Sequence, residues 1–584
     1  MKDMKAMKTR LNREWRLAIA GQTRTGGALL LFFMLFMIFM PFASSVLVFQ
    51  TAPQRIGGLL PAPDRRAGEG LGPFKTLVIR GVMVIDGTGA PPFGPMDVVV
   101  EGNRIARIIS AGTPGVPRSK PVTEGTEVGT ANRQGSATPT SVPSVTHEID
   151  GTGMYLLPGF INLHQHLGDP QKAPDNEYVF KLWMAHGVTA GRGVELAQQT
   201  LAVREKERSA SNTIVAPRIF NYQRPGAGWS GGVVDTPEKA REWVRWCAAN
   251  NVDGMKLVAH PPAIMAALLD EGKKLGLGST AHLQQLGVAQ MNALTAAKLG
   301  LGTVTHFYGH FEALLKDYEI QPWPVEMNYN DEQWRFSQVA RLWDKIHEPG
   351  SPEWKAYLAE HVKLGTIFDP TMTAYAASRD VMRMRNADWH QKYTLPSLMD
   401  FYTPSRVNHG SYYWDWTTAD EIAWRNFYQV WFRLLNDYKK MGGRVTASDD
   451  AAYIYNTWGF GYIHELELLQ EAGFHPLEVI RGATMHAAEA LHEPKGQPIQ
   501  FGIVRAGLLA DMVIVDQNPL QNLKVLYGTG AVRLNDRTGV PERVGGIKYT
   551  IKDGIVYDAK KLLADVATMV EKQKRERQTN AAGK

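Results

Sequence analysis

The chain has 584 residues, of which 44% are hydrophobic and 21% are charged. This composition excludes wholesale disorder, and the length exceeds that of one ordinary domain. The net charge of +6 lies mainly in the first 50 residues, where seven Lys and Arg face two acidic residues, so no nucleic-acid-binding surface is expected on the folded part.

Residues 1–50 are predicted to be a basic flank followed by a signal peptide or membrane anchor. Residues 28–40 form an uninterrupted apolar run that follows the basic flank and precedes small residues, which is the layout of a secretory signal. The apolar character resumes up to Phe49, so an uncleaved anchor that holds the protein on the membrane is the alternative. Both predict a periplasmic or other extracytoplasmic protein, because the basic flank stays in the cytoplasm.

Short β-type runs occupy both ends of the remaining chain. Residues 76–157 are predicted to be the N-terminal part of a β-sandwich, interrupted at 111–146 by a mobile insertion rich in Gly, Pro, Ser and Thr. Residues 497–558 contain similar strands and a hairpin that turns at Asp553-Gly554. The two parts are expected to form one composite β-sandwich, and 559–584 to be a charged tail.

Residues 158–491 alternate short β-type runs with helical stretches. This alternation predicts an α/β fold, specifically a (β/α)8 TIM-like barrel. An aromatic-rich insertion at about 310–440 holds nine of the fifteen tryptophans, and we expect it to supply one strand and a helical cover over the barrel mouth. Its aromatic residues either line a substrate pocket or pack the core of the insertion.

Candidate metal ligands follow the β-type runs of this barrel. The pair His164 and His166 lies two residues apart on an apolar run, which places both imidazoles on one face of a strand. The other candidates each end a later run, and the spacings of 26 and 24 residues between the first three each fit one βα unit; they are Lys256, His282, His306 and Asp449. Because the carboxyl ends of barrel strands meet at one rim, the six side chains are expected to converge there.

At this point the chain resembles the amidohydrolase superfamily, in particular its imidazolonepropionase-like and prolidase-like hydrolases. The resemblance spans residues 76–558. The matching segments are 157–166 (LPGFINLHQH), 186–189 (HGVT), 253–256 (DGMK), Ala281-His282, Thr305-His306, Ser448-Asp449, 506–516 (AGLLADMVIVD) and 518–520 (NPL).

The resemblance implies a centre of two divalent metal ions, usually zinc. His164, His166 and Asp449 would bind one ion, His282 and His306 the other, and a CO2-derived carbamate on Lys256 would bridge both. A hydroxide bridging the two metals would attack the substrate carbonyl, and Asp449 would carry its proton to the leaving nitrogen. The ligand type does not separate zinc from manganese, cobalt or iron.

Two features of this assignment stay open. The family motif of the last strand commonly reads Gly-Thr-Asp, whereas this chain has Ala447-Ser448-Asp449-Asp450, so two carboxylates compete and the motif frame favours Asp449. Four further residues lie just beyond strand ends, where they either contact substrate or serve local packing: His260, Tyr308, His310 and Tyr375.

These features predict a hydrolase of a carbon–nitrogen bond that acts on a small molecule such as a cyclic amide, or on a dipeptide such as Xaa-Pro. Two alternatives remain. The protein could be a lactonase or esterase that uses the same site, or a non-catalytic scaffold that has kept the fold and lost the metals. The sequence allows a homo-oligomer without indicating one.

Overall fold

The computed structural model describes residues 55–112, 146–194, 199–405 and 410–582. The predicted signal or anchor at 1–50 and nearly all of the predicted insertion at 111–146 lie outside these residues. Within the described ranges, no helix is both long enough and apolar enough to cross a membrane.

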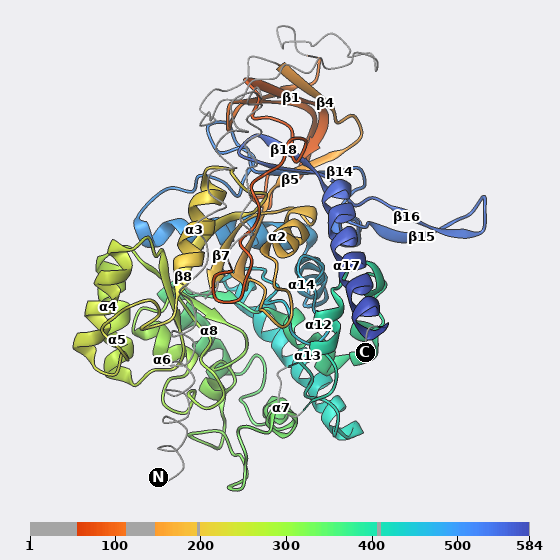
Figure 1. The fold of residues 1–584 in the computed structure, drawn as a ribbon. Coiled ribbons are helices and arrows are strands. Elements are labelled where there is room, and N and C mark those ends of the chain that lie inside the picture. The colour runs from red at the N-terminus through yellow and green to blue at the C-terminus, as the bar shows by residue number, and fades with distance from the viewer. Residues whose placement is uncertain (1–54, 113–145, 195–198, 406–409, 583–584) are drawn as a thin grey trace, which may run out of the picture. The chain divides into compact units, whose positions relative to one another are not determined.

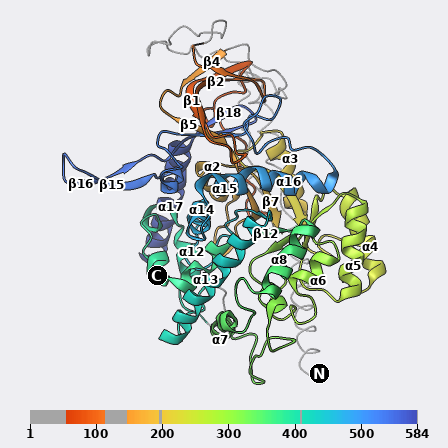
Figure 2. The ribbon, with the colours of Figure 1, turned by 180° about the vertical axis from the view of Figure 1, so that it is seen from behind.

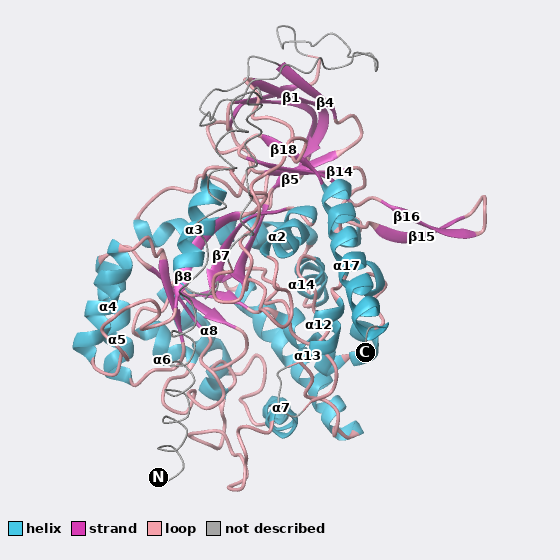
Figure 3. Ribbon diagram, viewed as in Figure 1, coloured by secondary structure: helices cyan, strands magenta, loops and turns pink. Residues whose placement is uncertain are grey.

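Eight parallel strands form one sheet in which each strand pairs with the next along the chain (Figure 3). Most of their residues are buried, because helices cover the outer face of the sheet. The strands are β6 (Phe160–Gln165), β7 (Val188–Val194), β8 (Arg218–Gln223), β9 (Gly254–Leu257), β10 (Gly278–Ala281), β11 (Thr303–Thr305), β12 (Ile367–Asp369) and β13 (Arg444–Val445).

Side chains join the first barrel strand to the segment after the last one. The amide of Leu163 in β6 donates to Oγ of Ser448 at 3.0 Å, and Nδ2 of Asn162 donates to Oδ1 of Asp449 at 2.6 Å. These bonds bring the end of β13 against β6, so the two ends of the sheet meet.

A buried arginine links further strands inside the barrel. Arg192 of β7 is 1% exposed, and its Nε donates to the carbonyl of Leu163 at 2.7 Å. Its Nη1 donates to Thr303 at 3.1 Å, and Nη2 donates to Thr280 at 3.1 Å and to Asp369 at 3.4 Å. One guanidinium therefore ties strands β6, β7, β10, β11 and β12 together.

Helices cover the outside of the barrel (Figure 1). Several begin with a side-chain cap, such as Asp175 before α2 and Thr236 before α4. Those between strands and after β13 are α2 (Asn176–Ala185), α3 (Gln199–Ala210), α4 (Pro237–Ala249), α5 (Pro262–Lys274), α6 (Ala293–Lys298), α14 (Phe460–Glu471), α15 (Pro476–Arg481), η4 (Gly482–His486), α16 (Ala487–His492) and η5 (Glu493–Lys495).

The aromatic-rich segment contributes strand β12 and a group of helices, as expected. Two of its tryptophans, Trp424 and Trp431, are buried, and both contact the ring of Phe307. Its helices are η1 (Glu312–Leu314), α7 (Glu332–Ala340), η2 (Arg341–Asp344), α8 (Pro352–Leu364), η3 (Met372–Tyr375), α9 (Ala376–Arg379), α10 (Val381–Arg385), α11 (His390–Tyr393), α12 (Pro396–Phe401) and α13 (Thr418–Lys440).

Strands from both ends of the chain form a second sheet, in the order β18-β17-β14-β5-β1-β2-β3, with β4 also paired to β1. The two ends meet where β14 runs antiparallel to β5, with Ile514 opposite Leu156. The predicted fold class, a barrel with a composite sheet, is confirmed. The strands are β1 (Thr76–Val84), β2 (Phe93–Glu101), β3 (Arg104–Ser110), β4 (Thr146–Asp150), β5 (Tyr155–Pro158), β14 (Met512–Val515), β17 (Ile547–Lys552) and β18 (Ile555–Asp558).

Three further elements complete the C-terminal part. The short helix η6 (Leu523–Leu526) precedes a hairpin of β15 (Ala531–Asn535) and β16 (Val540–Val544), which extends away from the composite sheet (Figure 1). The expected charged tail is a long helix, α17 (Ala559–Ala582). It packs along α2, α11 and α12 (Figure 2) and buries Leu562, Leu563, Val566 and Val570, so its inner face belongs to the core.

Candidate functional site

The candidate ligands lie at the carboxyl ends of the barrel strands. His164 lies near the end of β6 and Lys256 in β9, which are the first and fourth strands of the barrel. His282 follows directly after β10, and His306 after β11. Lys256, His282 and His306 thus lie on three consecutive strands, one βα unit apart, as their spacing predicted.

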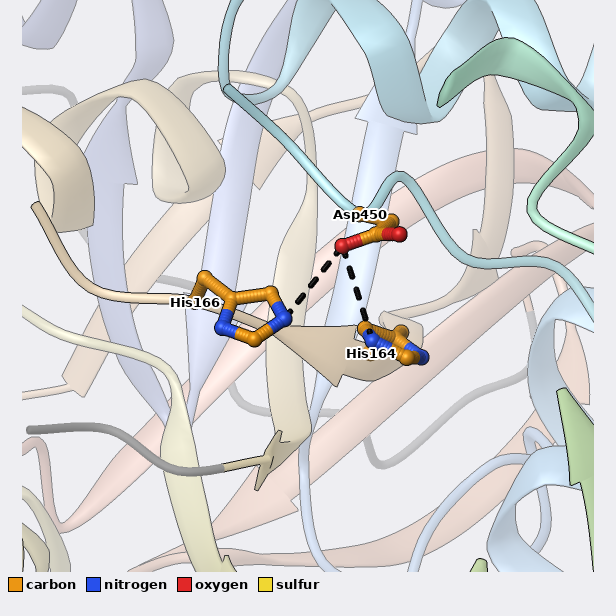
Figure 4. A group of neighbouring side chains, drawn as sticks. All are labelled: His164, His166 and Asp450. Atoms are coloured by element: carbon orange, nitrogen blue, oxygen red, sulfur yellow. Dashed lines mark ion pairs between the residues drawn. The ribbon is translucent and has the colours of Figure 1, made fainter. Parts of the chain in front are cut away.

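His164, His166 and Asp450 form a compact group whose ligand atoms all lie within 4.8 Å of one another (Figure 4). Oδ1 of Asp450 lies 3.5 Å from Nε2 of His164 and 3.3 Å from Nε2 of His166, and Oδ2 lies 3.6 Å from Nε2 of His306. Three imidazole nitrogens thus face one carboxylate.

The structure favours Asp450 over the sequence-based choice of Asp449. The carboxylate of Asp449 accepts hydrogen bonds from Asn162 at 2.6 Å and from Nε1 of Trp183 at 2.9 Å, which directs it into the barrel wall. Burial raises the pKa of Asp449 to about 6. The backbone of Asp450 has a positive φ of 41°, and this turn presents the second carboxylate to the histidines.

Lys256 extends into the same group. It is 2% exposed, and its Nζ lies 2.9 Å from Nε2 of His164. Burial lowers the pKa of Lys256 to about 7, and burial, with the Lys256 charge as a smaller cause, holds the pKa of His164 well below its usual value. The environment therefore favours uncharged nitrogen atoms, which are the forms that bind metals.

A hydrogen bond on its Nδ1 atom orients the ring of His306. Its Nδ1 hydrogen-bonds Oγ1 of Thr371, leaving Nε2 directed toward Asp450. The ring of His282 lies 4.5 Å from that of His306, and Tyr308 stacks on His282 at 4.7 Å between centroids. His282 is thus placed beside the three-residue group, and His306 lies between them.

Several non-glycine residues at this rim have positive φ, among them His306 at 67°, Thr371 at 49° and Asp450 at 41°. Such backbone conformations cost energy in residues with a Cβ and persist where the surrounding structure imposes them. Their presence at one rim indicates a functional site.

A cavity of about 220 Å³ lies over the histidines. Of the four candidate substrate residues, Tyr308 and Tyr375 line it, and their hydroxyls lie 3.3 Å apart. His310 does not line it; its Nδ1 bonds the Tyr357 hydroxyl at 2.6 Å, so local packing explains this residue. His260 is also absent from the cavity lining.

Sequence reasoning missed several lining residues, most of them in the aromatic-rich insertion. Those in the insertion include Tyr329, Glu332, Arg335, Phe336 and Tyr412. Among the residues that the structure describes, no tryptophan lines this cavity. Because these residues belong to irregular turns and short helices without a repeating spacing, no sequence signal marks them.

Comparisons with known proteins bear on the fold. No protein-family model and no curated protein matches this chain. Among solved structures, a bottromycin amidohydrolase has a TM-score of 0.53 at 16% identity, with 84% of this chain and 91% of that chain covered. A Xaa-Pro dipeptidase with bound methionine in the active site has a TM-score of 0.51 at 16% identity, with coverages of 83% and 100%.

A protein from Bifidobacterium longum assigned as a prolidase has a TM-score of 0.51 at 18% identity, with 84% of this chain and 99% of that chain covered. These matches extend over nearly the whole of each relative, so they include more than an isolated barrel. At sequence identities of 16–18%, a structural similarity establishes only the fold. The chain therefore has the fold of these amidohydrolase and dipeptidase structures, which is the fold expected from its motifs.

Proposed function

We propose that this protein is a metal-dependent hydrolase of a carbon–nitrogen bond in a small amide or dipeptide. The observation that carries the proposal is the convergence of three imidazole nitrogens on the Asp450 carboxylate at 3.3–3.6 Å.

The donor set fits divalent metal ions. Two ligand atoms bound at about 2.0–2.1 Å to one tetrahedral ion lie about 3.3 Å apart, close to the separations around Asp450. In addition, Oδ1 of Asp450 and Nε2 of His306 are buried without a hydrogen-bond partner within the described residues. Buried polar atoms of this kind call for a ligand that completes them.

Two ion positions account for the rim residues. His164, His166 and Asp450 would hold one ion, and His282 and His306 the other. Lys256 stands beside His164, where an ammonium would repel two cations and a carbamate would attract them. We therefore propose that Lys256 would carry a CO2-derived carbamate, whose negative charge would help to hold both ions.

A bound divalent ion, zinc or another, supplies Lewis acidity that activates water and polarises the substrate carbonyl. In the chain itself, Asp450 is the carboxylate positioned to accept a proton from the attacking water and pass it to the leaving nitrogen. Tyr308 and Tyr375 line the cavity with their hydroxyls 3.3 Å apart, where they can orient the substrate. Aromatic walls limit the water around the reacting group.

The size of the cavity favours a small substrate. Its volume of about 220 Å³ is below the usual range for sites that hold drug-sized molecules. The fold relatives include an amidohydrolase and a Xaa-Pro dipeptidase, which makes amides and Xaa-Pro dipeptides the first candidates. Because the same chemistry cleaves esters, lactones belong in any test.

We also propose that the protein acts outside the cytoplasm, because residues 28–40 form the apolar part of an export signal or anchor. Fractionation of cells that express the full chain tests this. Recovery in a periplasmic or membrane fraction supports export, and recovery in the soluble cytoplasm contradicts it.

The activity test uses the metal-loaded chain against dipeptides, N-acyl amino acids, cyclic amides and lactones. We expect hydrolysis of at least one amide, loss of activity on chelation and recovery on adding zinc, manganese or cobalt. His166→Ala should abolish activity, whereas His260→Ala, outside the cavity lining, should retain it. Activity confined to lactones, or amide hydrolysis unaffected by chelation, would contradict the proposal.

A further inference from the structure

A second, wider cavity of about 1290 Å³ adjoins the one over the histidines. His166 and Tyr453 line both cavities. A substrate held over the histidines can therefore extend past these two residues into the wider cavity.

Lys172 lies at this junction, in the loop between β6 and α2. Its backbone is fixed, because its amide donates to the carbonyl of Asp169 at 3.0 Å and its carbonyl accepts from Oγ of Ser397 at 2.6 Å. Its half-buried side chain places Nζ 4.1 Å from the ring centroid of Phe401 and 4.8 Å from that of Tyr453. The two rings hold the ammonium at the wall of the wider cavity, which Lys172 also lines.

The charge of Lys172 has no direct partner within the part of the chain that the structure describes: the ammonium contacts the two rings and makes no hydrogen bond or ion pair. Two neighbouring cations differ from Lys172 in pairing or exposure. Arg335 donates to Glu332 at 3.1 Å, which balances its charge, and Arg204 lies on the exposed side of α3.

The surroundings of Lys172 favour an anion. Burial lowers the pKa of the Lys172 ammonium, while the more distant carboxylates of Asp169 and Asp450 partly oppose that shift. The ring faces accept no conventional hydrogen bond, so the N–H donors of the ammonium that do not point at the rings remain available. A carboxylate in the cavity would form charge-assisted hydrogen bonds with these donors, and the restricted side chain would lose little further freedom on binding.

We propose that Lys172 binds a carboxylate of the substrate, so that the enzyme prefers amides with a free acid group, such as N-acyl amino acids and dipeptides, over neutral amides and lactones. This inference rests on the proposed hydrolase function and makes Lys172 a specificity-determining residue that lies outside the metal ligands.

A matched pair of ligands tests it: N-acetyl-L-proline and N-acetylpyrrolidine, which lacks the carboxylate. Binding to the metal-loaded full chain is measured by calorimetry for the wild type, Lys172→Met and Lys172→Arg, with Lys273→Met on the exposed face of α5 as the control. We expect the wild type to bind the acid at least 10-fold more tightly than the neutral compound.

In Lys172→Met the affinity for the acid should fall 10- to 100-fold while that for the neutral compound changes less than two-fold. Lys172→Arg should retain most of the preference, and Lys273→Met all of it. If the wild type shows no preference, or if Lys172→Met weakens both ligands equally, the inference is refuted.

Hydrolysis separates this inference from the proposed function. For an acid substrate identified in the panel, Lys172→Met should raise KM at least 10-fold and change kcat less than three-fold. If the metal-loaded wild type cleaves no amide, the proposed function fails, and the calorimetric comparison still decides the role of Lys172. If cleavage continues without preference for acids, only the role of Lys172 is lost.

Discussion

Replacing Arg192 with methionine is expected to destabilise the barrel. Arg192 and its partner Asp369 are 1% and 0% exposed, so removal of the guanidinium leaves a buried carboxylate without its counter-charge. Breaking such a pair typically costs about 3–5 kcal/mol, which for a compact unit of this size lowers Tm by about 3–5 °C. The hydrogen bonds to Leu163, Thr280 and Thr303 are lost as well.

The destabilisation should depend on pH. Burial raises the pKa of Asp369 and the Arg192 charge opposes that shift, so removing Arg192 raises the folded-state pKa further above the unfolded value. A carboxyl group with a raised folded-state pKa contributes stability that is lost as pH rises through that pKa. Arg192→Met should therefore lose more stability relative to the wild type at pH 8 than at pH 5.

Thermal unfolding followed by circular dichroism at both pH values measures the effect, with Arg537→Met in the exposed hairpin turn as the control. In the double variant Arg192→Met/Asp369→Asn the losses should be less than additive by about 1 kcal/mol or more, because the partners interact directly. A Tm for Arg192→Met within 2 °C of the wild type at pH 8 would refute the reasoning.

Three further predictions concern the site and its surroundings. Asp450→Asn should lose metal and activity, with little change in the stability of the metal-free protein. Asp449→Asn should instead lower that stability by about 1–3 kcal/mol, because its new amide group would face N–H donors. Metal analysis and thermal unfolding distinguish the two variants, and the reverse pattern would restore Asp449 as the ligand. Thr371→Val removes the hydroxyl that hydrogen-bonds Nδ1 of His306. It should weaken binding of the second metal about 10- to 100-fold in a chelator competition. An unchanged affinity would contradict the ligand role of His306. Burial raises the pKa of Glu312 to about 7, so the contribution of Glu312 to stability falls as pH rises toward 7. Glu312→Gln should therefore be more stable than the wild type by about 3 kcal/mol at pH 8 and by nearly nothing at pH 4.5. An equal difference at both pH values would contradict this.

The sequence predicted those parts of the molecule that repeat. Apolar runs at regular spacing marked the barrel strands, and the residue that ends each run, such as His282 or His306, proved to lie at the rim. This works because parallel strands have a common direction, so position along a strand determines position at the rim. Strands of like composition at both ends of the chain likewise indicated the composite sheet.

The sequence could not decide between neighbouring carboxylates. Asp449 and Asp450 have the same chemistry, and a single backbone angle, φ of 41° at Asp450, determines which one faces the histidines. The lining residues Arg335 and Tyr412 come from short helices and turns of the insertion, where no period relates sequence to direction. The burial of one face of α17 was not predicted, because its charged residues outnumber the few apolar residues that it buries.

The most direct test of the account is a crystal structure of the zinc-loaded protein with anomalous diffraction measured on both sides of the zinc absorption edge. We predict a strong anomalous peak bounded by His164, His166 and Asp450, a second beside His282 and His306, and density for a carbamate on Lys256 between them. Full zinc loading with no peak among His164, His166 and Asp450 would contradict the central claim that these residues form a metal centre.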